Sequence, residues 1–204
     1  MKPRCKGGEI IDILEKYKEL KMKIVCIGWG SLIWNPGELI IQNHWFEDGP
    51  MLPIEFTRIS NDNRVTLIID REAKSIKTLW ALMTCDDLYK AKESLMKREG
   101  ISKIDRIHSA IQNETVKDKI ESEIQKWLIE KGIDSAIWTG LSYSKKTKYK
   151  RPSIDCIISH LSNLTDGQKK DAENYIRKAP KQINTEYRKT IEERLGWTPI
   201  EQET

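Results

Sequence analysis

Two short segments carry residues whose types and spacing point to chemistry. The first is the loop Gly28-Trp29-Gly30-Ser31, which follows the apolar residues 24–27. Glycine adopts φ > 0 easily and lets a ligand approach the backbone, so successive N–H groups in such a loop can bind a carboxylate, a phosphate or an oxyanion. The loop lacks the third glycine of a dinucleotide-binding motif and the Gly-Lys-Ser/Thr of a P-loop. The alternative interpretation is a plain turn between two strands.

The second segment is the run Lys-Arg-Glu-Gly, which contains Glu99. Helical spacing places Leu88, Leu95 and Glu99 on one face of a helix. The two leucines indicate that this face points inward, although Lys92 interrupts the apolar stripe. Burial and the helix dipole both favour the neutral form of a carboxyl group in this position, which suits a residue that shuttles a proton. The alternative is a frayed helix end that turns Glu99 to water beside Arg98.

Together the two segments resemble the γ-glutamylcyclotransferase-like proteins, and in particular their ChaC-type branch. In the run IVCIGWGSLIWNPGEL, the strand, the Gly-Ser-Leu loop and the turn with Trp and Pro are similar to the opening of that family. The later run TLWALMTCDDLYKAKESLMKREG resembles its strand, helix and Arg-Glu segment. The chain also resembles a bacterial branch that begins with a similar GWGSLIW segment and contains short motifs like the WTGL and LGW found later in this sequence. The resemblance covers residues 24–100.

This resemblance implies an enzyme that releases 5-oxoproline from a γ-glutamyl compound. The α-amine of the substrate attacks its own γ-carbonyl, Glu99 acts as the general acid/base, and no metal or cofactor takes part. The family's loop tyrosine is replaced by Trp29, whose indole N–H stands in place of a hydroxyl, and this departure bears on the identity of the substrate. The residues expected to bind the γ-glutamyl group are Gly28, Trp29, Gly30, Ser31 and Leu32.

The rival function is a non-catalytic module that binds a small anionic ligand on the glycine loop or nucleic acid on a basic loop. Residues 144–151 carry five positive charges beside two tyrosines, whereas the net charge of the whole chain is only +4. Basic residues interleaved with aromatic ones can bind phosphates and stack on bases. The same loop can also be a solvated mobile segment, or a lid over an anionic substrate. The basic residues are Lys145, Lys146, Lys148, Lys150 and Arg151.

The composition predicts neither a metal site nor a membrane span. The three histidines and four cysteines form no recognised ligand motif. Cys26, Cys85 and Cys156 lie in apolar runs, which is typical of small buried side chains in a reducing compartment. The longest uncharged stretch, residues 24–37, is too short for a membrane-spanning helix, and residues 1–10 lack the apolar core of a secretory signal. We therefore expect a cytoplasmic protein; no oligomeric state is predicted.

The elements that must position these residues indicate a single α+β domain. Of the 204 residues, 38% are hydrophobic and 32% are charged, as in a globular domain. Because helices and strands do not alternate strictly, we expect a mixed sheet or small β-barrel surrounded by helices, as in the γ-glutamylcyclotransferase-like fold. A helical insertion is expected at about 101–132 and a helical C-terminal part from about 165. The patterns predict helices at 9–21, 86–98, 115–131, 165–178 and 186–195, and strands at 24–27, 51–59, 65–70, 78–83, 136–141 and 154–160.

Overall fold

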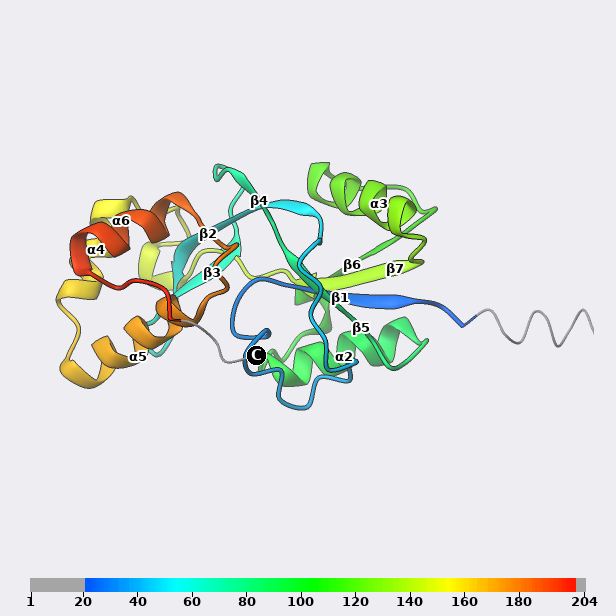
Figure 1. Cartoon of the computed structure of the whole chain (residues 1–204), viewed down its shortest axis with the longest axis horizontal. Coiled ribbons are helices and arrows are strands. Elements are labelled where there is room, and N and C mark those ends of the chain that lie inside the picture. The colour runs from blue at the N-terminus through cyan, green and yellow to red at the C-terminus, as the bar shows by residue number, and fades with distance from the viewer. Residues whose placement is uncertain (1–20, 201–204) are drawn as a thin grey trace, which may run out of the picture.

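The computed structural model describes residues 21–200, which form two β-sheets with helices packed around them (Figure 1). This arrangement confirms the α+β class; the helix expected at 9–21 lies, except for its last residue, outside the described residues. The described strands are β1 (Ile24–Gly28), β2 (Met51–Ile59), β3 (Val65–Ile69), β4 (Ser75–Lys77), β5 (Leu79–Leu82), β6 (Ile107–Ile111) and β7 (Ser135–Thr139). The described helices are α2 (Leu88–Arg98), α3 (Lys119–Lys131), α4 (Ile154–Ser162), α5 (Asp166–Lys178) and α6 (Glu186–Leu195), with 3-10 turns at Ile104–Arg106 and Lys145–Thr147.

Strand β1 lies inside a mixed sheet with the strand order β5-β1-β7-β6. It pairs antiparallel with β5 and parallel with β7, and β6 pairs antiparallel with β7. Ile24 and Cys26 pack on the α2 side of this sheet, whereas Val25 and Ile27 join the larger core on the other side, where α3 packs. Burial on both faces explains why the run is apolar without alternation. The glycine loop therefore starts from a rigid, buried strand.

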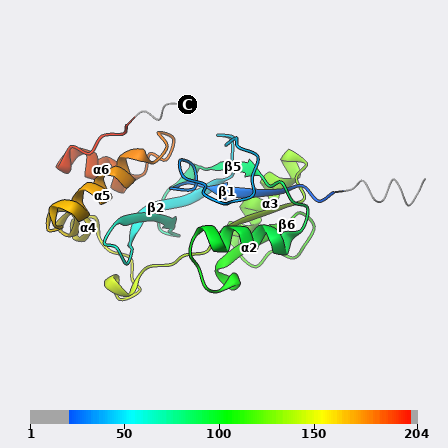
Figure 2. The same ribbon diagram turned by 90° about the horizontal axis from the view of Figure 1, so that it is seen from below.

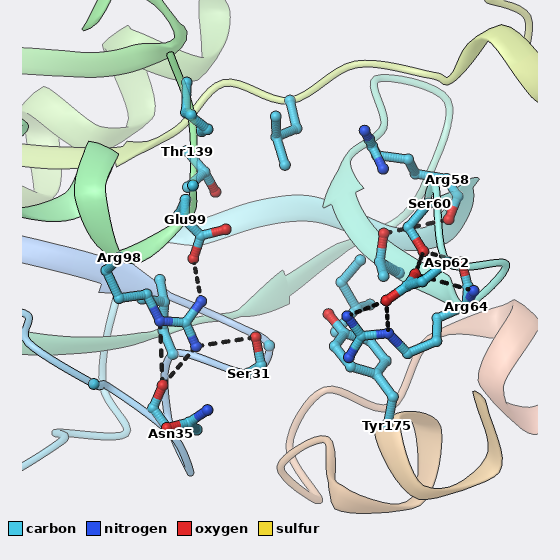
Figure 3. Close-up of a pocket in the computed structure, with 18 of the residues that line it drawn as sticks. Ser31, Asn35, Arg58, Ser60, Asp62, Arg64, Arg98, Glu99, Thr139 and Tyr175 are labelled. Carbon is cyan, nitrogen blue, oxygen red and sulfur yellow. Dashed lines mark hydrogen bonds and ion pairs between the residues drawn. The ribbon is translucent and has the colours of Figure 1, made fainter. Parts of the chain in front are cut away.

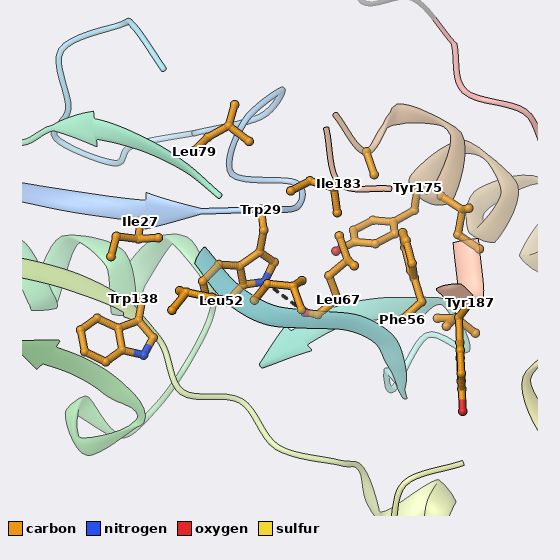
Figure 4. Close-up of a cluster of buried hydrophobic side chains, with 14 of the residues drawn as sticks. Ile27, Trp29, Leu52, Phe56, Leu67, Leu79, Trp138, Tyr175, Ile183 and Tyr187 are labelled. Carbon is orange, nitrogen blue, oxygen red and sulfur yellow. Dashed lines mark hydrogen bonds between the residues drawn. The ribbon is translucent and has the colours of Figure 1, made fainter. Parts of the chain in front are cut away.

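The second sheet, with the order β3-β2-β4, carries the C-terminal helices. Helix α6 packs on β2, α5 packs on β3, and α4 contacts both of these helices. Figures 1 and 2 show the three helices gathered at one end of the molecule, away from α2 and α3. A continuous apolar core joins the two sheets and includes Trp138, Phe56, Tyr175 and Tyr187 (Figure 4).

The small β-barrel considered from the sequence is not formed, because the described strands make two separate open sheets. The chain passes from β4 into β5 at Thr78, which pairs with neither sheet. Instead its N–H and hydroxyl both donate to the carbonyl of Pro50, at 3.2 and 2.8 Å. This interruption separates the β2–β3–β4 sheet from the mixed sheet.

One predicted strand is wrong: residues 154–160 form helix α4. Ser153 caps this helix by accepting a hydrogen bond from the N–H of Cys156 at 3.2 Å. Ile157 and Leu161 are buried four residues apart on the same helix face. A short apolar run of this kind has no period that separates a strand from a buried helix.

The segment expected as a helical insertion, 101–132, also contributes strand β6 to the mixed sheet. Helix α3 begins later than predicted, since Asp118 is its N-cap and accepts from the N–H of Glu121. Val116 consequently lies outside the helix and is 40% exposed. Gly132 ends α3 in the left-handed conformation, as its position predicted. No helix within residues 21–200 combines the length and the apolar character that crossing a membrane requires.

Candidate functional site

The structure brings both chemically suggestive segments into one pocket of about 1100 Å³ (Figure 3). Its walls come from the glycine loop, the end of α2, the β2–β3 hairpin and helix α5. Glu99 lines it together with Trp29 and residues 30–32. Gly28 does not line it: this glycine lies under the ring of Trp45, where a Cβ would approach to 2.8 Å. Four of the five expected loop residues thus reach the pocket.

A Schellman motif at the end of α2 sets the position of Glu99. Glu99 is the C-cap residue, and Gly100 follows with φ +62°. The N–H of Gly100 donates to the carbonyl of Lys97, and that of Ile101 to the carbonyl of Met96, at 3.1 and 3.0 Å. A residue with a side chain would be strained at this left-handed position. The Glu-Gly pair therefore ends the helix and leaves the carboxylate at the pocket.

The Glu99 side chain is 17% exposed and forms an ion pair with Arg98. The same guanidinium donates to the hydroxyl of Ser31 at 3.1 Å and, through Nε, to the carbonyl of Asn35 at 3.2 Å. Arg98 is itself only 10% exposed. The frayed-end alternative is thus not observed, because the pair with Arg98 forms inside the pocket and ties Glu99 to the glycine loop.

The glycine loop is a single tight turn with unused donors. The N–H of Ile33 bonds to the carbonyl of Gly30 at 3.0 Å, and the N–H of Asn35 to that of Ser31 at 2.9 Å. Within residues 21–200, the N–H groups of Gly30, Ser31 and Leu32 have no hydrogen-bond acceptor. Neither loop glycine has positive φ, so close packing rather than backbone freedom requires them. These three free donors suit an anion or an oxyanion.

Tyr175 of α5 is a pocket residue that the sequence analysis did not single out. A Cβ on Gly30 would lie 2.8 Å from its hydroxyl oxygen. Burial raises the pKa of Tyr175 to about 12, against the opposing effect of a backbone hydrogen bond from Leu67. The phenol is therefore protonated at neutral pH and can donate a hydrogen bond. Helical spacing in 165–178 marks Tyr175 as inward-facing, but an inward aromatic residue usually indicates core.

Trp29 does not present a free hydrogen-bond donor to the pocket. Its indole N–H donates to the carbonyl of Leu67 at 3.4 Å, and its side chain is 4% exposed. Trp34 lines the same pocket and packs edge-on against Tyr175, with ring centroids 5.5 Å apart. Trp138 lines a separate cavity beside His108.

Arginine side chains supply most of the positive charge in the pocket. Arg64 is paired with Asp62, at 2.6 Å, and lies over the Tyr175 ring. Arg58 extends from β2 toward Glu99 from the opposite wall (Figure 3). Arg106 also lines the pocket and, like Arg58, forms no ion pair within the described part of the chain.

The basic loop is held in place against the β2–β3 turn, whose residues Ser60 and Asn61 line the pocket. Lys146 donates to the carbonyls of Ser60 and Asn61, at 2.7 and 2.9 Å. Arg151 pairs with the buried carboxylate of Asp70 at 2.8 Å, and Tyr143 donates to the same group. These contacts anchor the loop, so it is not the mobile segment that the sequence allowed. None of its five basic residues lines the pocket. Within residues 21–200, the basic side chains of this loop that form neither a hydrogen bond nor an ion pair are Lys145, Lys148 and Lys150.

The expected burial of the cysteines holds for one of the three. Cys26 is fully buried in β1, and burial raises the pKa of its thiol. Cys85 is half-buried, and Cys156 is exposed because its segment is a helix rather than a strand. Among the described residues, no three His, Cys, Asp or Glu side chains are grouped so that they could hold a metal ion.

Comparisons of the chain with protein-family models, with curated proteins and with solved structures found no match. A functional assignment therefore depends on the geometry of the pocket and on the resemblance carried by residues 24–100.

Proposed function

We propose that this protein is a γ-glutamylcyclotransferase-like enzyme that releases 5-oxoproline from a γ-glutamyl compound. The observation that carries the proposal is the meeting of Glu99 with the free N–H groups of residues 30–32 in one pocket. A carboxylate and a set of oxyanion donors are the two functions that this cyclisation needs.

In the proposed reaction, Glu99 removes a proton from the α-ammonium of the substrate. The freed amine attacks the γ-carbonyl carbon and forms a five-membered ring with a tetrahedral oxyanion, which the loop N–H groups stabilise. The bond from this carbon to the leaving nitrogen then breaks, and Glu99 returns its proton to that nitrogen. The products are 5-oxoproline and the free amine. Because the nucleophile belongs to the substrate, the enzyme mainly enforces a folded conformer.

Arg98 acts in this proposal as a positioning residue. Its guanidinium contacts both the Glu99 carboxylate and the Ser31 hydroxyl, so the acid/base and the loop keep a constant relation. Bidentate guanidinium contacts supply geometric specificity as well as charge.

Although Trp29 replaces the loop tyrosine of the family, the pocket still contains a phenol hydroxyl. Tyr175 presents its phenol beside Gly30, although it comes from a helix far along the chain. We assign to it a hydrogen bond to the γ-glutamyl group.

The test is an assay of 5-oxoproline release with glutathione, γ-glutamyl dipeptides and γ-glutamyl amines. We expect release by the wild type from at least one compound, and a loss of about 10²–10⁴-fold in the Glu99→Gln variant, which keeps the shape of the side chain but cannot accept the proton. Silence of the wild type across the panel would contradict the proposal.

The alternative is a non-catalytic module that binds a small anionic ligand in the same pocket. The unpaired arginines and the free loop donors favour this second function. This alternative predicts that the Glu99→Gln variant binds the ligand with the affinity of the wild type, and that neither protein converts the ligand to a product. The nucleic-acid version has less support, because Lys146 and Arg151 are committed to contacts within the chain.

A further inference from the structure

The guanidinium of Arg58 lies in the pocket and has no hydrogen-bond or ion-pair partner among residues 21–200. Its Nε is buried and has no hydrogen-bond acceptor, and no described residue forms an ion pair with this side chain. In Figure 3, Arg58 and Glu99 project into the pocket from opposite walls. Buried polar atoms in native proteins normally have a hydrogen-bond partner, so the buried Nε of Arg58 beside a cavity points to a binding site for an anion.

Arg106 strengthens this indication, because it adds a second unpaired cation to the same pocket. Burial and, after it, the charge of Arg106 lower the pKa of Arg58, so the two guanidinium groups act on each other. An anion between them would remove this repulsion.

The acidic groups that act on Arg58 are already engaged. Asp62 accepts hydrogen bonds from Arg64 and Ser60, and Glu99 is paired with Arg98. Two further carboxylates line the pocket at exposed positions, and neither is among the groups that act on Arg58. They are Glu38 and Asp171.

We propose that Arg58 and Arg106 bind an anionic group on the leaving amine, so that the enzyme selects γ-glutamyl compounds whose leaving amine carries a carboxylate or a phosphate over those with a neutral or cationic one. This inference depends on the proposed function for the γ-glutamyl half of the substrate. Guanidinium groups match the planar, bidentate geometry of such anions. The pocket volume of about 1100 Å³ leaves room for a second group beyond the one at the glycine loop.

The charge of the leaving group can be tested with a matched pair, γ-glutamylglycine and γ-glutamylglycinamide, which differ by one negative charge. For the wild type we expect kcat/KM to be about 10- to 100-fold higher for the acid, which is the range for hydrogen bonds to charged groups. In Arg58→Gln this ratio should fall several-fold, because only Arg106 is left to bind the carboxylate, whereas the amide, which offers no anion to Arg58, should lose much less turnover than the acid. The amide therefore also reports whether the variant folds.

A matched control removes a different positive charge from the same pocket. Lys97 lines the pocket, but it is 65% exposed and paired with Glu93. Lys97→Gln should keep the wild-type preference for the acid. An equal kcat/KM for acid and amide in the wild type, or a ratio that survives Arg58→Gln, would overturn the inference.

Binding measured by calorimetry separates this inference from the proposed reaction. With Glu99→Gln protein, γ-glutamylglycine should bind more tightly than the glycinamide, and the added Arg58→Gln change should reduce the difference, because only Arg106 then remains to bind the carboxylate. If this holds but the wild type releases no 5-oxoproline, the proposed reaction fails and the anion site stands. If the wild type turns over both compounds equally well, the reaction stands and the anion site fails.

Discussion

The carboxylate of Glu99 and the hydroxyl of Ser31 accept hydrogen bonds from one guanidinium, that of Arg98. This contact joins the end of α2 to the glycine loop, two segments that are far apart in the sequence. It explains how a residue at a helix terminus is held against a turn that leaves strand β1. The proposed acid/base and the proposed oxyanion donors are therefore parts of one connected unit.

The first prediction concerns Arg98 as a positioning residue. Arg98→Gln should lower kcat/KM by about 10²-fold, because the carboxylate loses its fixed position relative to the loop. Arg98→Lys should recover little, since a point charge cannot contact both Glu99 and Ser31. Steady-state kinetics with Lys97→Gln as the control measures this. Wild-type activity in Arg98→Gln would show that the bridge has no part in the reaction.

The second prediction concerns the hydroxyl of Tyr175. Tyr175→Phe removes the oxygen beside Gly30 but keeps the ring that packs on Trp34 and Phe56. We expect kcat to fall by about 10²-fold, the cost of losing one donor to a developing oxyanion, with little change in stability.

The pH profile offers a separate check on the same residue. The phenol is a donor only while protonated, and its pKa is raised from 10.0 to about 12. Its contribution should therefore persist through pH 10 and be lost only as the pH approaches 12. A wild-type profile in which the Tyr175-dependent part of the rate disappears near pH 10 would contradict this.

The third prediction follows from the contact between Gly30 and Tyr175. A methyl group on Gly30 would lie 2.8 Å from the Tyr175 hydroxyl, so Gly30→Ala must displace the loop or the helix. We expect a loss of stability of about 1–3 kcal/mol and a marked loss of activity. In the double variant with Tyr175→Phe, part of the stability should return, because the clashing atom is absent.

Gly167 provides the control for this substitution. It lies in α5, and apart from the adjoining helix backbone a Cβ at this position would meet no atom of residues 21–200 within 4 Å. Gly167→Ala should raise stability by up to about 1 kcal/mol through helix propensity and leave activity unchanged. If Gly30→Ala were as harmless as Gly167→Ala in thermal and urea unfolding, the packing described for the loop would be incorrect.

Features of the site that depend on residues close together in the sequence could be predicted, whereas features that depend on contacts between distant segments could not. Strand β1, the turn that follows it and helix α2 were predicted correctly because their signals are local: an apolar run, two glycines after it, and leucines at helical spacing. Arg58 and Tyr175 were missed because only the tertiary fold brings their strand and helix to the pocket. No local pattern distinguishes a tyrosine that reaches a pocket from one that fills a core.

The errors have an equally physical origin. Helix α4 was predicted as a strand because residues 154–160 are short and apolar, and the Ser153 cap was not recognised as a start signal. Strand β6 lies in a segment that was expected to be helical, and its five residues are too few to show a clear alternation: Ile107 and Ala110 are buried, whereas His108 is exposed.

The fourth prediction concerns Glu55, a buried carboxyl group in β2. It accepts hydrogen bonds from the N–H groups of Phe56 and Tyr187, at 2.8 and 3.2 Å, and so joins β2 to the first turn of α6. Burial is the largest effect on this group and raises its pKa above the ordinary 4.5. The folded state therefore holds the proton more tightly than the unfolded state does.

Since the folded pKa is the higher one, the favourable contribution of Glu55 is complete below pH 4.5 and is lost as the pH rises through the folded pKa. Glu55→Gln, which cannot titrate, removes this dependence. Urea unfolding of both proteins between pH 4 and pH 7 should show the stability of the wild type falling relative to that of the variant. A relative rise with pH would contradict the assignment.

The central claim is that Glu99 is the acid/base of a cyclisation in this pocket. The most direct measurement is the rate of 5-oxoproline release by the wild type, by Glu99→Gln and by Glu38→Gln, whose exposed carboxylate lines the same pocket. We predict release by the wild type and by Glu38→Gln, and a loss of at least about 10²-fold in Glu99→Gln. Release by Glu99→Gln at the wild-type rate would contradict the account.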